Sequence, residues 1–521
     1  MCLKNTSKLM NEEVREIYIE LWSLCKDVER PLCHKYRSLR ELFERVARGQ
    51  MQNVSLQATD LAARINYLAT QYSLDRWVKN ALHTFRLTSN DVMNHRKEPL
   101  EEEFFRDIRA VAEAIQVIYH TPIPKELTEI LPVQMPKYSM KREKNVLERR
   151  IRVSFEYADA EFLYVTPVDE VSDEYWKIRY NQLGVNDEFA EGIKDYWRHA
   201  QLNLLDVKRN EDGTYTPSFI VLEPDYLVDI SALAECYRDY GSHPANYIMS
   251  RLVPIDNARP LLLGNIANLF LDEWIYASEE EPEYLDCMKK VFKRYPVELA
   301  ACEELLDKEK ETAFFKDCQM HFEHIRQTVK DTFLEPGYNL DKSDAVLEPS
   351  YICEALGVQG RLDYMQRDMS SFIEMKSGKA DEYAMKGKLE PKENNRVQML
   401  LYMAVLEYSM GIDRRKQHPY LLYTRYPLLY PARASWAQVR RIIALRNRIV
   451  AAEYGTQMHN HPSYTAELLA QINPVTLNEK KLQGRFWEQY LASNINDFQK
   501  HLQSLDDLEK TYLYTLYNFI T

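Results

Sequence analysis

The sequence of 521 residues lacks a long apolar run, a C-x-x-C motif and a P-loop. Its longest apolar stretch, near 261–271, is interrupted by one glycine and two asparagines, so no segment is typical of a membrane span. The N-terminal MCLKNTSKLMNEEV lacks the apolar core of a signal peptide. We therefore expect an intracellular, cytoplasmic protein without membrane contact, associated with the nucleoid if it is bacterial.

The other two absences concern redox chemistry and nucleotides. The eight cysteines are scattered without C-x-x-C pairs, which favours reduced, structural thiols. Without a G-x-x-x-x-G-K-[ST] loop, this chain is not expected to hydrolyse ATP through a P-loop, and we predict no nucleotide cofactor. The net charge of −12 implies that any nucleic acid must be bound by local basic patches.

The periodicity of apolar residues divides the chain into parts, and its length suits roughly three or four domains of about 150 residues. We predict a multidomain α+β protein. The stretch 146–224 alternates apolar and polar residues, which indicates a small β-barrel. A barrel of the OB type would suit single-stranded DNA, and a purely structural module fits the pattern equally well. The expected parts are a helical N-terminal domain (1–145, ending in a linker, Pro132–Lys144), the β-barrel (146–224), an α/β domain (225–455) with a helical insert (282–335), and a helical tail (456–521).

The most informative stretch, 354–408, is predicted to form two strands, a polar loop and a helix. The first strand, Val358–Gln366, carries Asp363, and the second, Phe372–Lys376, carries Glu374 as well as Lys376. Residues two apart on a strand point to the same face, so Glu374 and Lys376 project together, and Asp363 joins them if the register allows.

Two carboxylates and a lysine at one sheet edge suit a hard divalent cation. Mg²⁺ and Mn²⁺ take oxygen ligands and retain waters for a phosphate substrate. A lysine beside such an ion can orient or help to deprotonate a water molecule. The alternative is a surface hairpin with solvated charges beside an amphipathic helix.

The motifs here are G-x-x-D, E-x-K and Q-x-x-x-Y, in that order. Together they resemble the RecB-like branch of the PD-(D/E)xK nucleases. The resemblance implies a restriction-endonuclease-like nuclease core in 225–455 that hydrolyses single-stranded or flap DNA in repair or replication. In such enzymes the tail leads into a helicase motor, so we expect a truncated or split helicase–nuclease with a helicase in cis or trans. The matching residues are Gly360, Asp363, Glu374, Lys376, Gln398 and Tyr402.

The resemblance also implies residue roles. Asp363, Glu374 and the carbonyl of Met375 would hold Mg²⁺ or Mn²⁺, and Lys376 would position the attacking water. Gln398 and Tyr402 would bind the DNA strand or support the site from behind. For Tyr402, packing of its helix against the sheet is an equal alternative.

Two departures from the family pattern concern metals. Where RecB-like enzymes carry G-x-x-x-H, this chain has Gly264 followed by Asn268. An asparagine carbonyl can still coordinate Mg²⁺, and Asp272, one turn further on, could assist through water. No cysteine follows Cys353, so we expect no iron–sulfur cluster.

A helix in the insert carries Cys318, His321 and His324, which superficially suggest a zinc site. Steps of three residues drift around a helix axis, so the outer two side chains converge poorly. The ligand set is also incomplete. We interpret the trio as part of an ordinary solvated or half-buried helix.

Positive charge gathers after the motifs. The segment 425–452 contains six arginines and no acidic residue. On a helix beginning near Ser435, Arg440, Arg441 and Arg448 fall on one side, and arginine forks suit phosphates. Because the segment has no counter-charges, we predict that these three, with Lys379 in the polar loop, bind DNA. A solvated basic face is the alternative.

Two hypotheses from other classes stay open. Asn268 in place of the family's histidine motivates a non-catalytic DNA-binding scaffold. The helical N-terminal half motivates an assembly platform for a separate helicase.

Overall fold

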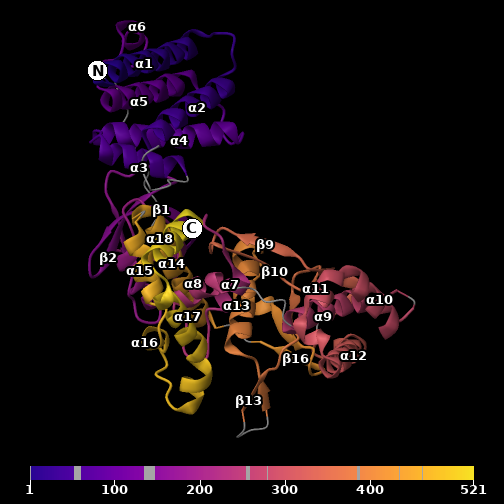
Figure 1. Ribbon diagram of the computed structural model, residues 1–521. Coiled ribbons are helices and arrows are strands. Elements are labelled where there is room, and N and C mark those ends of the chain that lie inside the picture. The colour runs from indigo at the N-terminus through magenta and orange to yellow at the C-terminus, as the bar shows by residue number, and fades with distance from the viewer. Residues whose placement is uncertain are drawn as a thin grey trace. The chain divides into compact units, whose positions relative to one another are not determined.

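The computed structural model forms two compact units, Met1–Glu223 with Gln457–Asn460 and Pro224–Thr456 with His461–Thr521 (Figure 1). Among the described residues, no helix combines the length and the apolar character that a bilayer span requires. The predicted linker lies outside the described residues from position 134 onward. The described residues are 2–51, 60–133, 147–253, 259–278, 280–338, 340–383, 388–432, 435–459 and 461–520.

The N-terminal part of the first unit is helical, as predicted. Its helices bury apolar stripes against one another, with Leu21, Leu39, Phe43 and Ile108 almost wholly inaccessible. Asp60 caps α3, its carboxylate accepting the Ala63 N–H at 2.7 Å. The helices are α1 (Cys2–Lys26), α2 (Leu32–Met51), α3 (Leu61–Gln71), α4 (Arg76–Met93), α5 (Glu101–Tyr119) and α6 (Lys125–Thr128).

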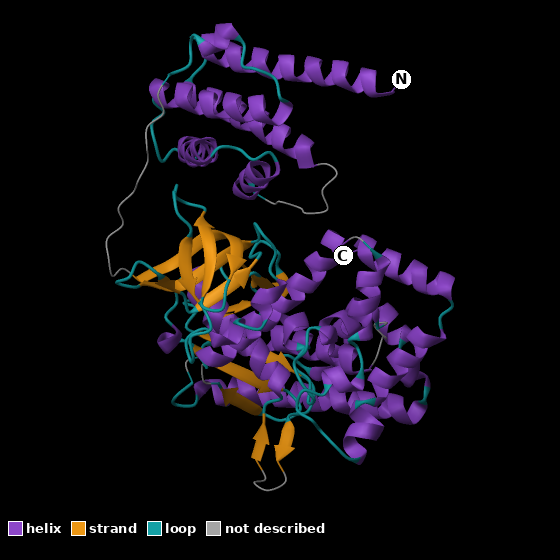
Figure 2. Cartoon of the chain, turned by 90° about the vertical axis from the view of Figure 1, so that its left-hand side faces the viewer, coloured by secondary structure: helices purple, strands orange, loops and turns teal. Residues whose placement is uncertain are grey.

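The predicted barrel is present in the same unit as a closed five-stranded sheet, whose strands form one group in Figure 2. The strand order is β1-β2-β3-β5-β4, and pairing of β1 with β4 closes the ring. Strands β3 and β5 run parallel, and the other neighbours run antiparallel. The strands are β1 (Leu147–Ala158), β2 (Phe162–Pro167), β3 (Trp176–Arg179), β4 (Gln201–Arg209) and β5 (Tyr215–Thr216), with β6 (Phe219–Leu222) paired to β4.

The second unit contains a mixed five-stranded sheet, β16-β15-β12-β11-β8, and a three-stranded sheet, β7-β10-β9. In the larger sheet β12 and β15 are parallel, and the other pairs are antiparallel. A hairpin of β13 and β14 extends away from the rest of the unit in Figures 1 and 2. The strands are β7 (Val228–Asp229), β8 (Ala345–Leu347), β9 (Ser350–Cys353), β10 (Val358–Arg361), β11 (Tyr364–Gln366), β12 (Ser371–Lys376), β13 (Asp381–Tyr383), β14 (Lys388–Glu390), β15 (His418–Tyr423) and β16 (Leu428–Pro431).

Helices cover both faces of the larger sheet. Ile373 and Met375 of β12 face α9 (Arg259–Tyr276) and α12 (Lys308–Lys330), where they join one buried apolar cluster. On the other face lies α13 (Glu393–Met410), tied to β15 by the Asn395 amide, which donates to the Tyr423 hydroxyl at 2.8 Å. Since side chains alternate along a strand, Glu374 and Lys376 face the α13 side.

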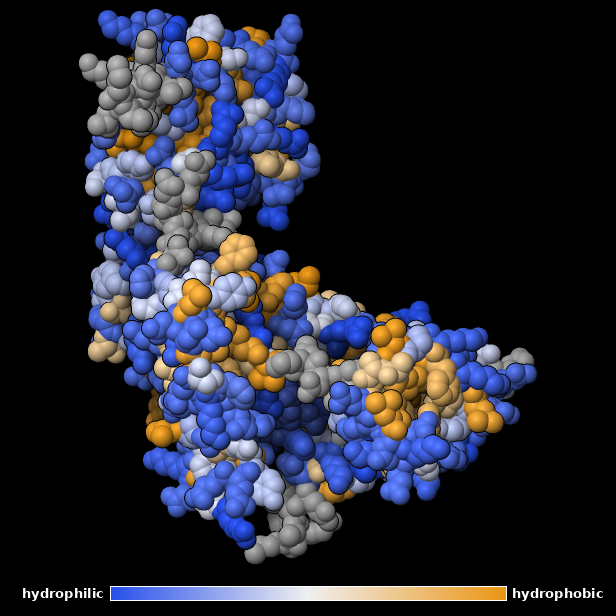
Figure 3. Space-filling view, viewed as in Figure 1, coloured by the Kyte–Doolittle hydropathy of each residue, from blue (hydrophilic) through white to orange (hydrophobic). Residues whose placement is uncertain are grey.

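The insert and the tail are helical, as predicted. Figure 3 shows apolar side chains on the surface of the insert region, and the exposed residues there include Leu285, Phe292 and Val297. The remaining helices are α7 (Ile230–Ala234), α8 (Ala245–Leu252), α10 (Tyr284–Arg294), α11 (Pro296–Ala301), α14 (Trp436–His459), α15 (Pro462–Ala470), α16 (Pro474–Leu477), α17 (Ser493–Ser504) and α18 (Asp507–Ile520), with a π-helical turn at Trp487–Leu491.

A buried arginine joins α14 to the turn before β10. Arg446 is wholly inaccessible, and its guanidinium donates to the carbonyl oxygens of Gly357 (3.1 Å) and Tyr226. Gly357 has φ +64°, and a Cβ there would lie 2.6 Å from the Arg446 Cζ. Only glycine fits both the left-handed backbone and the space beside the guanidinium.

Gly357→Ala is therefore expected to lower the free energy of unfolding of the second unit by about 3 kcal/mol, through backbone strain and displacement of a buried charge. Denaturant unfolding followed by circular dichroism measures the change. Gly378→Ala is the matched control, because its Cβ would meet nothing within 4 Å, and it should change the value by less than about 0.5 kcal/mol. Equal effects in the two variants would contradict the proposed fit.

Candidate active site

Asp363 lies at a break between two strands, not within one. The predicted strand Val358–Gln366 is wrong in this respect, because β10 pairs with β7 and β9, whereas β11 pairs with β8 and β12. The chain leaves one sheet and joins another at Leu362–Asp363. At this break the Asp363 carboxylate accepts the Met375 N–H at 2.6 Å. Asp363 is thereby fixed beside β12.

The register brings the three predicted catalytic side chains together. Tyr364 of β11 pairs with Ile373 of β12, so Asp363 comes opposite Glu374. The Lys376 ammonium donates to Glu374 Oε1 at 2.8 Å. It also donates to the side-chain oxygen of Gln398 on α13 at 2.9 Å. Two carboxylates, one ammonium and one amide thus form a single cluster.

The electrostatics of this cluster are dominated by burial. Glu374 is only 3% exposed, and its Oε2 has no hydrogen-bond partner among the residues that the structure describes. Burial, reinforced by the charge of Asp363, raises the pKa of Glu374 to about 8 against the opposing effect of Lys376. Burial also raises the pKa of Asp363, although the hydrogen bond from the Met375 N–H and the charge of Lys376 act to lower it. Burial alone would lower the pKa of Lys376, but the neighbouring carboxylates raise it overall, so it is a cation at neutral pH.

Further carboxylates lie beside this cluster. Asp272 on α9 has a pKa raised to about 6, first by burial and then by the charge of Glu348, with a smaller contribution from Asp363. Glu348 donates its backbone N–H to the Asp363 carbonyl at 3.1 Å and has a left-handed φ of +49°. Strained backbone of this kind gathers at functional sites. No motif in the sequence marked Glu348, and only its place before a proline was unusual.

Asn268, the predicted replacement for the family's histidine, is half-buried on α9, one turn before Asp272. Gly264, one turn earlier, lets this helix approach the chain after β12, since a Cβ there would lie 3.4 Å from Ser377 Oγ. Within the described ranges, no group of three or more His, Cys, Asp or Glu side chains is arranged to hold a metal. Any cation here would have to combine the Asp363–Glu374 pair with carbonyl, amide or water oxygens.

The residues on α13 support the site from behind. The Gln398 amide donates to Ser231 Oγ on α7 at 3.2 Å, while its oxygen accepts from Lys376. Tyr402 is fully buried, and its hydroxyl donates to the Arg361 carbonyl at 2.6 Å. The prediction that Tyr402 binds DNA is therefore corrected, because a buried ring holding the strand break cannot touch a substrate. Gly360 leaves room for this hydroxyl, which would lie 3.0 Å from a Cβ.

The predicted basic residues do not form one open surface. Arg440 is only 9% exposed and Arg448 is half-buried, whereas Arg441 is exposed. The physical reason is that α14 is packed on most of its circumference and is not a surface helix. Lys379 is exposed, three residues beyond Lys376. Arg441 and Lys379 therefore remain the accessible cations of the predicted DNA-binding set.

The histidines of α12 have structural partners. The ring of His321 is paired with Thr424 Oγ1 at 2.9 Å, and that of His324 with the Thr424 carbonyl at 3.0 Å. Thr424 in turn donates its N–H to the carbonyl of Lys376 at 3.0 Å. Both histidines therefore contact Thr424 through one ring nitrogen each, and the pair secures the end of β12.

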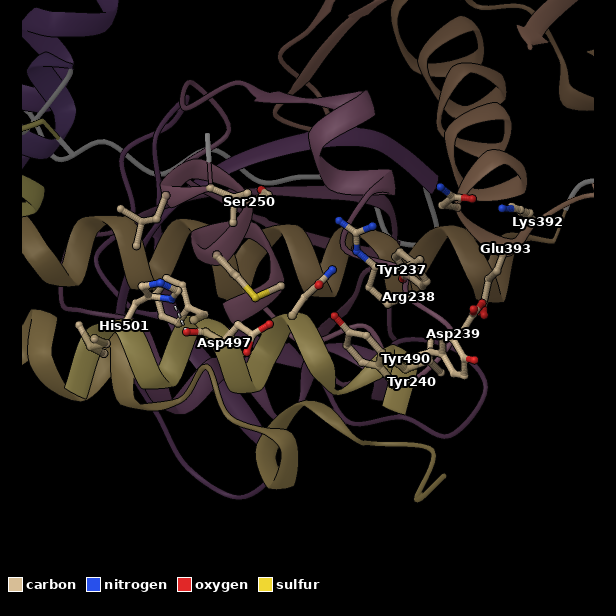
Figure 4. A pocket seen from close by; sticks show the side chains of 18 of the residues that line it. Tyr237, Arg238, Asp239, Tyr240, Ser250, Lys392, Glu393, Tyr490, Asp497 and His501 are labelled. Carbon is tan, nitrogen blue, oxygen red and sulfur yellow. Dashed lines mark hydrogen bonds between the residues drawn. The ribbon is translucent and has the colours of Figure 1, made fainter. Parts of the chain in front are cut away.

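A cavity of about 1010 Å³ lies in the same unit, between the first residues of α13 and the tail helices. Figure 4 shows Lys392 and Glu393 at one end and Asp497 and His501 at the other. Its described lining includes none of the predicted site residues. It is therefore a separate hollow.

Comparison of the sequence with models of protein families gave no match, and comparison with curated proteins gave none either.

The raised pKa of Glu374 predicts a pH dependence of stability. Without divalent cations the folded protein keeps this proton up to about pH 8, whereas the unfolded chain loses it near pH 4.5, so stability falls as pH rises between these values. Glu374→Gln should remove about 3 kcal/mol of that decline between pH 5 and 8. Thermal unfolding in a chelator between pH 5 and 8 measures it. Glu390→Gln, at an exposed glutamate, should leave the slope unchanged.

Proposed function

We propose that this chain is a metal-dependent nuclease that hydrolyses phosphodiester bonds of single-stranded or flap DNA in repair or replication, together with a helicase in cis or in trans. The observation that carries the proposal is the convergence of Asp363, Glu374 and Lys376 at the end of β12. Strongly perturbed pKa values of neighbouring groups are typical of catalytic sites. The motif order of the RecB-like nucleases supports the same reaction.

The residues present fit a hard divalent cation. Within the described part of the chain, the buried Glu374 Oε2 has no hydrogen-bond partner, and two carboxylates share a site with one lysine. Carboxylate and carbonyl oxygens are ligands that Mg²⁺ and Mn²⁺ accept. Asp363, Glu374 and the Met375 carbonyl would hold the ion, and the amide of Asn268 is the further ligand that the resemblance implies. When bound, such an ion polarises a phosphoryl oxygen and lowers the pKa of a coordinated water.

The chain's own residues supply the rest of the chemistry. Lys376 would hold the attacking water and offset the negative charge that develops on the phosphate. Gln398 fixes the ammonium by linking it to Ser231, so that the lysine is oriented before substrate arrives. Exposed Lys379 and Arg441 would contact the strand's phosphates.

The test uses 5′- and 3′-labelled single-stranded and flap DNA with Mg²⁺ and with Mn²⁺. Wild-type protein should cleave, and Asp363→Ala should lose at least about 100-fold in rate, because a carboxylate of the proposed metal site is removed. Lys376→Ala should also lose activity. Asp368→Ala, in the exposed turn of the same hairpin, is the matched control and should cleave normally.

The rival hypothesis is a non-catalytic DNA-binding scaffold, favoured by Asn268 at the position of the family's histidine. The same experiment separates the two. Absence of cleavage of either labelled end with either metal, from protein that still binds the oligonucleotide, would replace the nuclease proposal by the scaffold.

A further inference from the structure

The outer surface of the barrel in the first unit carries a group of aromatic side chains. Along β2, Leu163 and Val165 point into the barrel and are inaccessible, so Phe162 and Tyr164 point outward. Tyr157 of β1 lies opposite Tyr164 in the register and is 49% exposed. Tyr157 is thus an exposed ring beside the half-buried Phe162 and Tyr164, and contiguous apolar patches, when large, mark interaction sites.

The rings are already arranged for stacking. Tyr157 and Tyr164 lie parallel, with centroids 4.3 Å apart and an interplanar angle of 12°. Tyr175 meets Tyr157 edge to face at 6.0 Å and is itself 45% exposed. Phe162 meets Tyr164 edge to face at 6.4 Å. The Tyr157–Tyr164 pair thus forms a short stack that Tyr175 and Phe162 flank edge-on.

Cations from β3 lie over these rings. Lys177 pairs with Tyr164 in the register, and its ammonium lies 5.8 Å from the Phe162 centroid and 5.9 Å from that of Tyr164. The Arg179 guanidinium lies 5.1 Å from the Phe162 centroid. These cation–π contacts place positive charge among the rings.

Acidic groups on the same face limit that charge. Arg179 pairs with Asp212 at 2.7 Å and with Glu161 at 3.2 Å. Asp159 accepts the Tyr164 hydroxyl at 2.9 Å. Among the cations that the structure describes on this face, exposed Lys177 can approach a phosphate. Ring stacking has to supply most of the affinity.

We propose that the face formed by Tyr157, Phe162, Tyr164 and Lys177 binds a single-stranded nucleic acid, with bases stacked on the tyrosine pair and on Phe162. Interleaved rings and a lysine match a chain of flat bases joined by phosphates, and base–aromatic stacking is tolerant of sequence. The face belongs to the first unit, whereas the carboxylate cluster belongs to the second. This proposal rests on the proposed nuclease function in one respect only, namely that the nucleic acid is DNA.

The experiment measures affinity of the full chain carrying Asp363→Ala for fluorescein-labelled oligothymidylate in a chelator, so that cleavage cannot interfere. Adding Tyr157→Ala with Tyr164→Ala should weaken binding about tenfold or more. Tyr157→Phe with Tyr164→Phe keeps the rings and should keep the affinity. Trp22→Ala, at an exposed aromatic of the same unit, is the control and should have no effect.

Two further readouts locate the ligand. Lys177→Gln should reduce the slope of log affinity against log salt by about 0.7, the value for one phosphate contact on a single strand. Oligonucleotides containing 5-iodouracil should photocrosslink to peptides that carry Tyr157 or Tyr164.

The proposal would be overturned if the alanine and phenylalanine double variants bound the oligonucleotide with equal affinity, or if crosslinks were confined to the second unit. Tighter binding of an uncharged polysaccharide than of the oligonucleotide would also overturn it. Failure of the nuclease proposal gives a different result, namely no cleavage with binding at this face intact.

Discussion

The hydrogen bond from the Met375 N–H to the Asp363 carboxylate is the contact on which the candidate site depends. Asp363 occupies a break where the chain passes from one sheet to another, so strand geometry alone does not fix its direction. The bond to β12 supplies that direction and brings the carboxylate beside Glu374. Lys376, Gln398 and the supporting helix then complete a buried cluster whose charges balance only in part.

The sequence predicted the parts of this site that depend on local patterns. The spacing of Glu374 and Lys376 was sufficient to place two side chains on one face of a strand. The break at Leu362–Asp363 could not be predicted, because the residue pattern is continuous there and sheet membership is decided by pairing with β7, more than 120 positions earlier. Glu348 was missed because it belongs to no motif.

Helix α14 shows a different limit. Arginine spacing indicated one basic side, but spacing does not reveal what packs around a helix. The structure surrounds α14, so that Arg440 is nearly buried and Arg446 holds the backbone of the turn before β10. The closed barrel, in contrast, followed from the alternation of apolar residues, although the alternation did not show that outward rings of neighbouring strands meet in register.

The contact between Gly360 and Tyr402 makes the residue type allowed at one position depend on the residue at another, 42 residues away. A Cβ at position 360 would lie 3.0 Å from the Tyr402 hydroxyl and 3.1 Å from the Ile230 side chain, so a larger residue there requires both neighbours to yield. Loss of the Tyr402 hydroxyl would leave the Arg361 carbonyl without this donor. Neither position can drift alone during evolution. In related sequences the two should covary, with glycine retained wherever the tyrosine is retained.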